Sequence, residues 1–157
     1  MIARLEKNGF IPRDKHFQDK VRKSFDRQRA MSSLGITIDR IEPGKVVLKM
    51  PYLEAYTQQH GFVHAGILSA AMDSACGYAA FSLMPEEAAV LTIEYKVNLM
   101  APAKGDFFLL IGKVLKAGRT ITVCQAEAFC NREGEKRLIA HMTGTMMTVL
   151  GRKGIEQ

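Results

Sequence analysis

The stretch AGILSAAMDSACGYAAFSLM, residues 65–84, is apolar or small at nearly every position, and its one carboxylate is Asp73. An ionised carboxylate is costly to bury in an apolar helix unless another group pairs with it or water reaches it. Pro85 ends the run. The pattern therefore predicts a buried helix over about residues 65–83 in which Asp73 has a function.

Downstream of this helix the hydrophobic period changes to two. In LTIEYKVNL, residues 91–99, every odd position is apolar and every even one polar, which is typical of a strand. Further strands are predicted at 106–116, 119–130 and 137–149, and a hairpin at 36–41 and 45–50 turns at Pro43-Gly44. Long alternating runs with turns and no helices between them favour an antiparallel sheet. We predict an α+β fold, with about six strands around one long helix.

An amphipathic pattern precedes this fold. Phe17, Val21 and Phe25 recur at four-residue spacing over residues 14–31, with charges between them, and predict an amino-terminal helix. We expect residues 1–33 to pack on a single domain of residues 34–150, followed by a tail of residues 151–157.

Composition excludes several classes of protein. A hydrophobic content of 47% with 24% charged residues suits a packed core. Cys76, Cys124 and Cys130 show no C-x-x-C spacing, which argues against disulfides and zinc and for a reducing compartment. The amino terminus lacks a signal peptide's apolar stretch, and Asp73 argues against a membrane span over residues 65–84. We expect a cytoplasmic protein without a membrane partner.

The charge balance raises the question of nucleic acid. Net charge is +6 and the pI is near 9.3, but no nucleic-acid motif accompanies the basic residues. Basic turns suit any polyanion, including the phosphates of a nucleotide-tailed molecule. No cluster of His, Asp and Glu suggests a metal. We expect neither nucleic acid nor metal.

The start of the apolar helix offers free backbone N–H groups and a positive dipole end. Ala65 and Gly66 leave these groups accessible, and such donors hold the oxyanion that forms when an ester or thioester carbonyl is attacked. Asp73 would activate water as general base or attack the carbonyl itself, with Gln58 positioning water or carbonyl. A structural alternative stays open, with Asp73 paired to an arginine and Ala65-Gly66 serving tight packing.

His64 and Asp73 are nine positions apart, about 13 Å of helix rise and roughly 900° of rotation, so they point to opposite sides. Within one chain they would not easily act on the same atom. Two copies related by a two-fold axis could bring one helix start to the other copy's Asp73. We therefore expect a composite site at a homodimer interface.

A resemblance supports this interpretation. The motif is Gly61-x-x-His64-Ala65-Gly66, then Asp73 after six residues, then LTIEYKVNLMAPA at 91–103 and VLKAGRT at 114–120. It is similar to the hotdog-fold acyl-CoA thioesterases of the PaaI type over about residues 34–150. The resemblance implies a sheet wrapped around the helix, a homodimer that pairs two sheets, and in many members a homotetramer built as a dimer of dimers.

The resemblance also implies roles. Asp73 matches the catalytic acid, the backbone of Ala65 or Gly66 the oxyanion donor, and His64 the motif histidine beside the thioester. Gln58 stands where relatives commonly carry asparagine, and Ala65 replaces a glycine. Thr92 matches a hydroxyl near the attacking water, although an outward-facing strand threonine would have no such role.

The substrate is expected to be an acyl-CoA, so CoA is part of the substrate and no separate cofactor is implied. We expect Gly61 and Thr120, which belong to the motif, to line the substrate site. Lys116 and Arg119, beside the Ala-Gly turn, are candidates for contact with CoA phosphates. They are equally compatible with being ordinary exposed cations.

Two other functions fit this sequence. A dehydratase acting on hydroxyacyl thioesters would use His64 as base together with the helix carboxylate. A sensing module would bind acyl-CoA without turnover. The sequence does not decide the acyl group.

Overall fold

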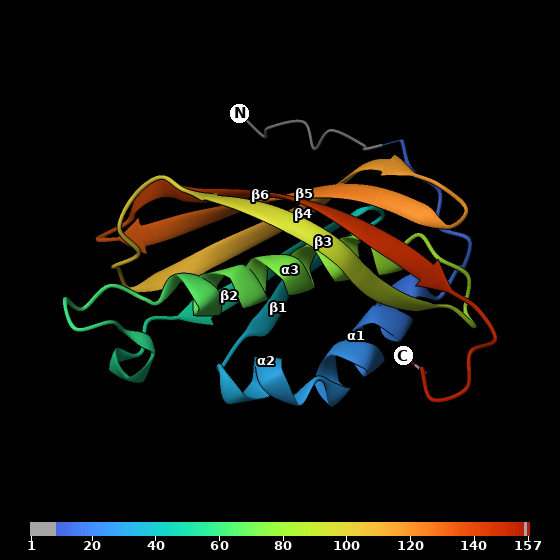
Figure 1. Cartoon of the computed structure of the whole chain (residues 1–157), viewed down its shortest axis with the longest axis horizontal. Coiled ribbons are helices and arrows are strands. Elements are labelled where there is room, and N and C mark those ends of the chain that lie inside the picture. The colour runs from blue at the N-terminus through green and yellow to red at the C-terminus, as the bar shows by residue number, and fades with distance from the viewer. Residues whose placement is uncertain (1–8, 156) are drawn as a thin grey trace.

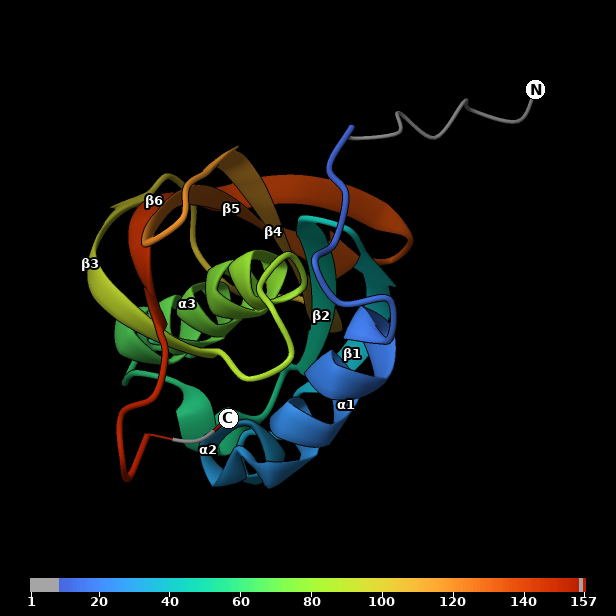
Figure 2. The same ribbon diagram turned by 90° about the vertical axis from the view of Figure 1, so that its right-hand side faces the viewer.

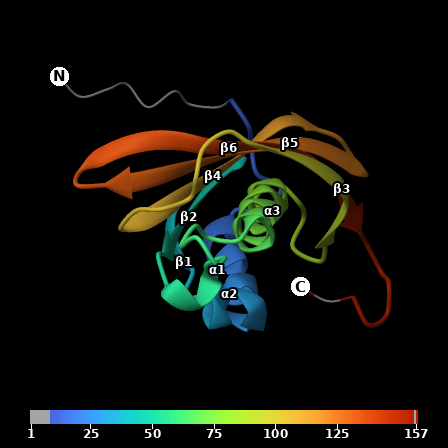
Figure 3. The same ribbon diagram turned by 60° about the vertical axis from the view of Figure 1, so that its left-hand side comes forward.

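One antiparallel sheet curves around one long helix. The computed structural model describes residues 9–155 and 157. Its six strands are ordered β1-β2-β4-β5-β6-β3, and α3 (Ala65–Phe81) lies along the concave face (Figures 1 and 3). The strands are β1 (Thr37–Glu42), β2 (Lys45–Pro51), β3 (Ala89–Leu99), β4 (Phe107–Ala117), β5 (Ile121–Arg132) and β6 (Glu135–Val149). The predicted α+β hotdog architecture is confirmed.

The central helix is buried on most of its surface, as its sequence predicts. Leu68, Met72, Ala75 and Phe81 are all almost fully buried. The helix ends at Phe81, two residues before the predicted end. The Ser82 hydroxyl closes it there, because it donates to the carbonyl of Ala79 at 2.7 Å and accepts from the Gly44 N–H at 2.8 Å.

The three cysteines lie in the core. Cys76 and Cys124 have no exposed surface, and Cys130 is also buried. Burial raises the pKa of the Cys124 thiol to about 12 and also raises the pKa of Cys76. Thiols in this state pack as small apolar groups and react slowly.

The amino-terminal helix is shorter than predicted. Instead of one pattern over residues 14–31, α1 (Phe17–Arg27) is followed by a short α2 (Arg29–Ser33). Gln28 separates them because its backbone has φ −80° and ψ 89°, which is not helical. This break between the helices places Met31 in the core, together with the buried α1 residues Val21 and Phe25. A 3₁₀ turn lies at Glu54–Tyr56.

Helix α1 flanks α3 at the β1 side of the sheet (Figure 2). The ring of Phe25 meets that of Tyr78 edge-on, with centroids 5.5 Å apart. The hydroxyl groups of Ser24 and Tyr78 lie 3.3 Å apart. This side of α3 is therefore covered within one chain, and Asp73 is on a different side of the helix.

Candidate active site

Asp73 lies in the middle of α3 and is hydrogen-bonded to β3. The hydroxyl of Thr92 donates to Oδ1 of Asp73 at 2.8 Å. No arginine or lysine lies within ion-pair distance of Asp73 among residues 9–155 and 157. Burial raises the pKa of Asp73, and the hydrogen bond from Thr92 opposes that rise. The carboxylate is thus half-buried, unpaired by a cation and suited to accept a proton.

A β-bulge decides which way Thr92 faces. Thr92 pairs with Met146 and Glu94 with Thr145, so Ile93 is an extra residue on β3. Without the bulge, strict alternation would place Thr92 on the face opposite Tyr95. With it, Thr92 shares the α3 side of the sheet with Tyr95, which pairs with the buried Gly144. The outward orientation considered for Thr92 is therefore wrong.

The start of α3 has one N–H group already used and one unpartnered. Nδ1 of His64 accepts a hydrogen bond from the Gly66 N–H at 2.9 Å and caps the helix. The Ala65 N–H has no acceptor in the part of the chain that the structure describes. Of the two predicted oxyanion donors, Ala65 is the one available in this conformation.

The loop before α3 is held by backbone hydrogen bonds. Gln58 bonds Phe62 through its N–H at 2.8 Å and Gly61 through its carbonyl at 2.9 Å. Gly61 has φ 77°, which a residue with a side chain rarely adopts. Tyr52 donates to the Gly61 carbonyl at 2.8 Å. Gln58 and Gly61 thus belong to one tight turn that leads to His64, and Gly61 has a conformational role there.

One chain does not bring all predicted residues together. Asp73 is eight residues from Ala65, about 12 Å along the helix. Lys116 lies near the end of β4, and Arg119 and Thr120 lie in the β4–β5 turn. A cavity there is lined by Ala80 of α3 as well as by Gly118, so the turn lies beside the carboxyl end of α3, far from His64.

Two features near this site did not stand out in the sequence. Tyr95 and Leu99 on the α3 side of β3 are 44% and 54% exposed, because no element of the described chain covers that edge of the sheet. The alternation in residues 91–99 was the available signal, but it does not show that β3 is an edge strand. The second feature is Lys104, whose ammonium lies 3.6 Å from the point that a Cβ on Gly61 would occupy.

We expect the hydrogen bond from Thr92 to affect the pH dependence of catalysis. Thr92→Val removes the bond that lowers the pKa of Asp73, so the pKa rises further. With the Asp73 carboxylate as the expected reactive form, the acidic limb of kcat/KM should move to higher pH. A pH–rate profile measures this, and Thr92→Ser, which keeps the hydroxyl, should leave the limb in place. An acidic limb that stays fixed in Thr92→Val would contradict this role.

No helix within residues 9–155 and 157 is both long and apolar enough to cross a membrane. In the same residues, no group of three or more His, Cys, Asp or Glu side chains could hold a metal ion.

Parts of this chain are similar in sequence to a known protein family and to named proteins. A profile of the thioesterase superfamily matches residues 60–136. A provisionally named esterase of Saccharolobus solfataricus is 34% identical over 94 residues, which span 60% of this chain and 66% of that protein. Another, of Halobacterium salinarum, is 32% identical over 105 residues, which span 64% of this chain and 69% of that protein.

Solved structures of other proteins are also similar to this chain. A thioesterase family protein from Silicibacter pomeroyi is 58% identical with a TM-score of 0.85, covering 86% of this chain and 99% of that one. The PaaI protein of E. coli, from the phenylacetic acid degradation operon, is 19% identical with a TM-score of 0.76, covering 85% of this chain and 93% of that one. The second likeness shows the fold alone.

Proposed function

The chain belongs to the thioesterase superfamily, and from that premise we propose that it hydrolyses an acyl-CoA to a free carboxylic acid and CoA. The observation that supports this most is the half-buried carboxylate of Asp73, which accepts from Thr92 and has no cation beside it among the described residues. Incubation with a panel of acyl-CoAs and a thiol-detecting reagent tests it. A dehydratase or a binding module would release no thiol.

Asp73 has two chemical routes. As a general base it takes a proton from water while the water oxygen attacks the thioester carbonyl, and it returns the proton to the departing thiolate. As a nucleophile its carboxylate oxygen attacks the thioester carbonyl, the C–S bond breaks and CoA leaves as the thiolate, and water then hydrolyses the resulting acyl anhydride. In both routes the carbonyl oxygen gains negative charge. The Ala65 N–H at the positive end of α3 is the proposed donor that stabilises this charge.

A second copy of the chain would bring a helix start close to Asp73, which one copy cannot do alone. β3 is an edge strand whose α3 side carries exposed Tyr95 and Leu99. Long apolar edge strands associate with another strand unless they are covered. A two-fold pairing along β3 would bring Ala65 of one copy toward Asp73 of the other. We propose a homodimer on this basis, and a dimer of dimers through the outward sheet face, where Ile121 is also exposed.

Ala65→Pro tests the proposed donor without breaking the helix. Proline is favoured at the first helical position, and His64, at φ −60° and ψ 135°, already has the backbone that precedes proline. The substitution removes the Ala65 N–H. We expect kcat to fall by about 10²–10³-fold with the thermal unfolding temperature nearly unchanged. Ala65→Gly, which keeps the N–H, is the matched control and should retain activity.

Mixing variants tests whether the site is shared. In a heterodimer of an Asp73→Asn chain and an Ala65→Pro chain, one of the two composite sites has both groups intact. Coexpression of the two inactive chains should therefore restore about a quarter of wild-type activity, since random pairing makes half of the dimers mixed. If both groups came from one chain, every site would be defective and no activity would return.

A further inference from the structure

The Thr92 hydroxyl has a second neighbour besides Asp73. Its Oγ1 lies 2.8 Å from Oδ1 of Asp73 and 3.3 Å from Sδ of Met146 on β6. Met146 is the cross-strand partner of Thr92, and it has no exposed surface. The hydroxyl therefore lies between a carboxylate on α3 and a thioether on β6. Met146 has no role in the catalytic steps proposed above.

A glycine two residues before Met146 leaves room for its side chain. A Cβ on Gly144 would lie 3.0 Å from Cε of Met146, which is closer than ordinary van der Waals contact. The methyl end of Met146 therefore occupies the space that a side chain at Gly144 would need. Because a packed interior leaves few other positions, this contact holds Sδ beside Thr92.

The carboxylate and the sulfur compete for one hydrogen. A hydroxyl group donates once, whereas an ionised carboxylate and a thioether sulfur only accept, the sulfur weakly. With Asp73 charged, the Thr92 hydrogen is therefore directed to Oδ1, the stronger acceptor, and Met146 receives none.

Protonation of Asp73 reverses this preference. In the general-base route an O–H bond of water breaks, the proton binds Asp73, and the electron pair of that bond stays on the oxygen that attacks the carbonyl carbon. With the proton on Oδ1, Asp73 donates toward Oγ1 of Thr92. The Thr92 hydrogen then turns to Sδ of Met146, which at 3.3 Å is within hydrogen-bond distance for a sulfur acceptor. Thr92 thus accepts from Asp73 and donates to Met146 at the same time.

We propose that Met146 is a positioning residue, whose sulfur accepts the Thr92 hydrogen while Asp73 holds the proton taken from water. This inference rests on the proposed thioesterase function and, within it, on the general-base route. Thr92 is exposed in one copy, but the proposed homodimer would cover β3, so water would not replace the sulfur there. A hydrocarbon in place of the sulfur would leave the Thr92 hydrogen without an acceptor and make the protonated carboxyl less stable.

The other titratable groups on the elements around Asp73 are two buried thiols, a tyrosine and a set of outward-facing side chains. Cys76 on α3 and Cys124 on β5 are the thiols, and burial raises the pKa of both. Tyr95 is the titratable residue on the α3 side of β3. The ionisable side chains on the outer face of β3, β6 and β5 include Glu94, Lys96, His141 and Glu127. None of these groups is hydrogen-bonded to Asp73 or Thr92 among residues 9–155 and 157.

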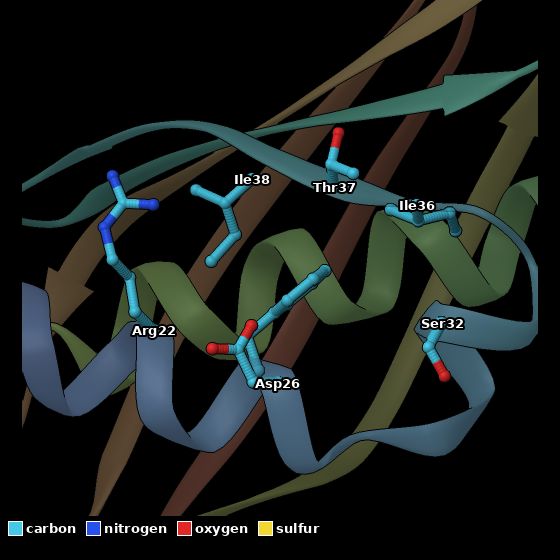
Figure 4. Close-up of a pocket in the computed structure, with 7 residues that line it drawn as sticks. Arg22, Asp26, Ser32, Ile36, Thr37 and Ile38 are labelled. Atoms are coloured by element: carbon cyan, nitrogen blue, oxygen red, sulfur yellow. The ribbon is translucent and has the colours of Figure 1, made fainter.

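The charged groups of α1 belong to another side of α3. Arg22 and Asp26 line a cavity of about 350 Å³ between α1, α2 and β1, and Figure 4 shows both side chains along its wall. Asp26 and Arg27 act on the pKa of Tyr78, which faces α1. The acidic limb of a pH–rate profile is therefore expected to follow Asp73 and its bond with Thr92.

Met146→Leu removes the sulfur and nearly conserves the side-chain volume. Because the protonated form of Asp73 loses stability, the acidic limb of kcat/KM should move to lower pH by about half a unit, opposite to the direction expected for Thr92→Val. Plateau kcat should fall by about two- to threefold, with KM unchanged. Met142→Leu, equally buried on β6 and paired with Val97, is the matched control and should leave the limb in place.

A double variant shows whether the sulfur acts through the hydroxyl. A Thr92→Val chain has no hydroxyl hydrogen for the sulfur to accept, so adding Met146→Leu should leave the acidic limb where Thr92→Val puts it. An acidic limb that stays fixed in Met146→Leu, moves equally in Met142→Leu, or moves further in the double variant would overturn the inference.

A ¹³C NMR titration of the Asp73 carboxyl group gives a readout that does not need turnover. Met146→Leu should lower the pKa of Asp73 by the same amount as it moves the acidic limb, and Met142→Leu should not change it. If the wild type releases no thiol from any acyl-CoA, the proposed function fails, and the titration still decides whether Met146 accepts from Thr92. An Asp73 pKa that is equal in the wild type and in Met146→Leu overturns the inference whether or not the protein is a thioesterase.

Discussion

Asp73→Asn should lower kcat for acyl-CoA hydrolysis by about 10³-fold or more. The amide occupies almost the same volume and can keep a hydrogen bond with Thr92, but it neither accepts a proton from water nor attacks a carbonyl. KM should change little, because the carboxylate acts on the reacting atoms and not on the CoA tail. Initial rates of thiol release, measured with saturating substrate, check this.

Folding of this variant should not suffer. Burial raises the pKa of Asp73, so the folded chain binds a proton more tightly than the unfolded chain does. That group's contribution to the free energy of unfolding therefore falls as pH rises from the unfolded pKa through the folded pKa. Asp73→Asn removes this loss, and at neutral pH the variant should unfold at the same temperature or higher. Asp26→Asn, at an exposed position of α1, is the matched control and should keep full activity.

Retention of more than a tenth of wild-type kcat in Asp73→Asn would contradict the catalytic role. A single turnover in ¹⁸O-labelled water tests for the nucleophilic route, because only that route, with water attacking the aspartyl carbonyl of the anhydride, places the label in the Asp73 carboxyl group. The general-base route places it in the released acid.

Gly112→Ala should destabilise the fold by about 3 kcal/mol or more. Gly112 lies on β4 directly under α3, and a Cβ there would overlap the backbone carbonyl of Ala75 and lie 2.8 Å from the N atom of Cys76. Backbone atoms in the middle of a buried helix have no free space into which to move. The helix would therefore separate from the sheet, and thermal unfolding should occur at a temperature lower by roughly 6–12 °C.

A second glycine in the same region is the matched control. Gly77 lies within α3, and a Cβ on it would meet nothing within 4 Å. Gly77→Ala should stabilise the helix by about 0.5–1 kcal/mol, because alanine loses less backbone entropy on folding. Opposite signs for the two glycine-to-alanine changes would show that close approach of helix and sheet is the constraint. Equal, small effects would contradict it.

Much of the fold was predictable because burial makes hydrophobic residues recur along the sequence at the spacing of a helix or a strand. The apolar run at 65–84 can be buried only as a central helix, and the alternation at 91–99 suits a strand with two different faces. The broken amino-terminal helix was not predictable, since the backbone of Gln28 leaves the helical region without a glycine or proline to signal it.

Some residues of the candidate site were likewise predictable from the sequence, and others were not. Asp73, His64 and Ala65 stand out from residue type and spacing alone, because a lone carboxylate in an apolar helix and small residues at a helix start are local features. Thr92 does not, because its direction depends on the bulge at Ile93, which exists only in the pairing of β3 with β6.

The sequence by itself determined one long buried helix, a strand-rich remainder and a carboxylate placed at the helix centre, since hydrophobic periodicity and the cost of burying charge act along the chain. Only the tertiary structure decided that β3 is an uncovered edge, that Thr92 donates to Asp73, and that Lys104 approaches Gly61. These contacts join residues far apart in sequence, and strand order and register, which no local pattern specifies, set their distances.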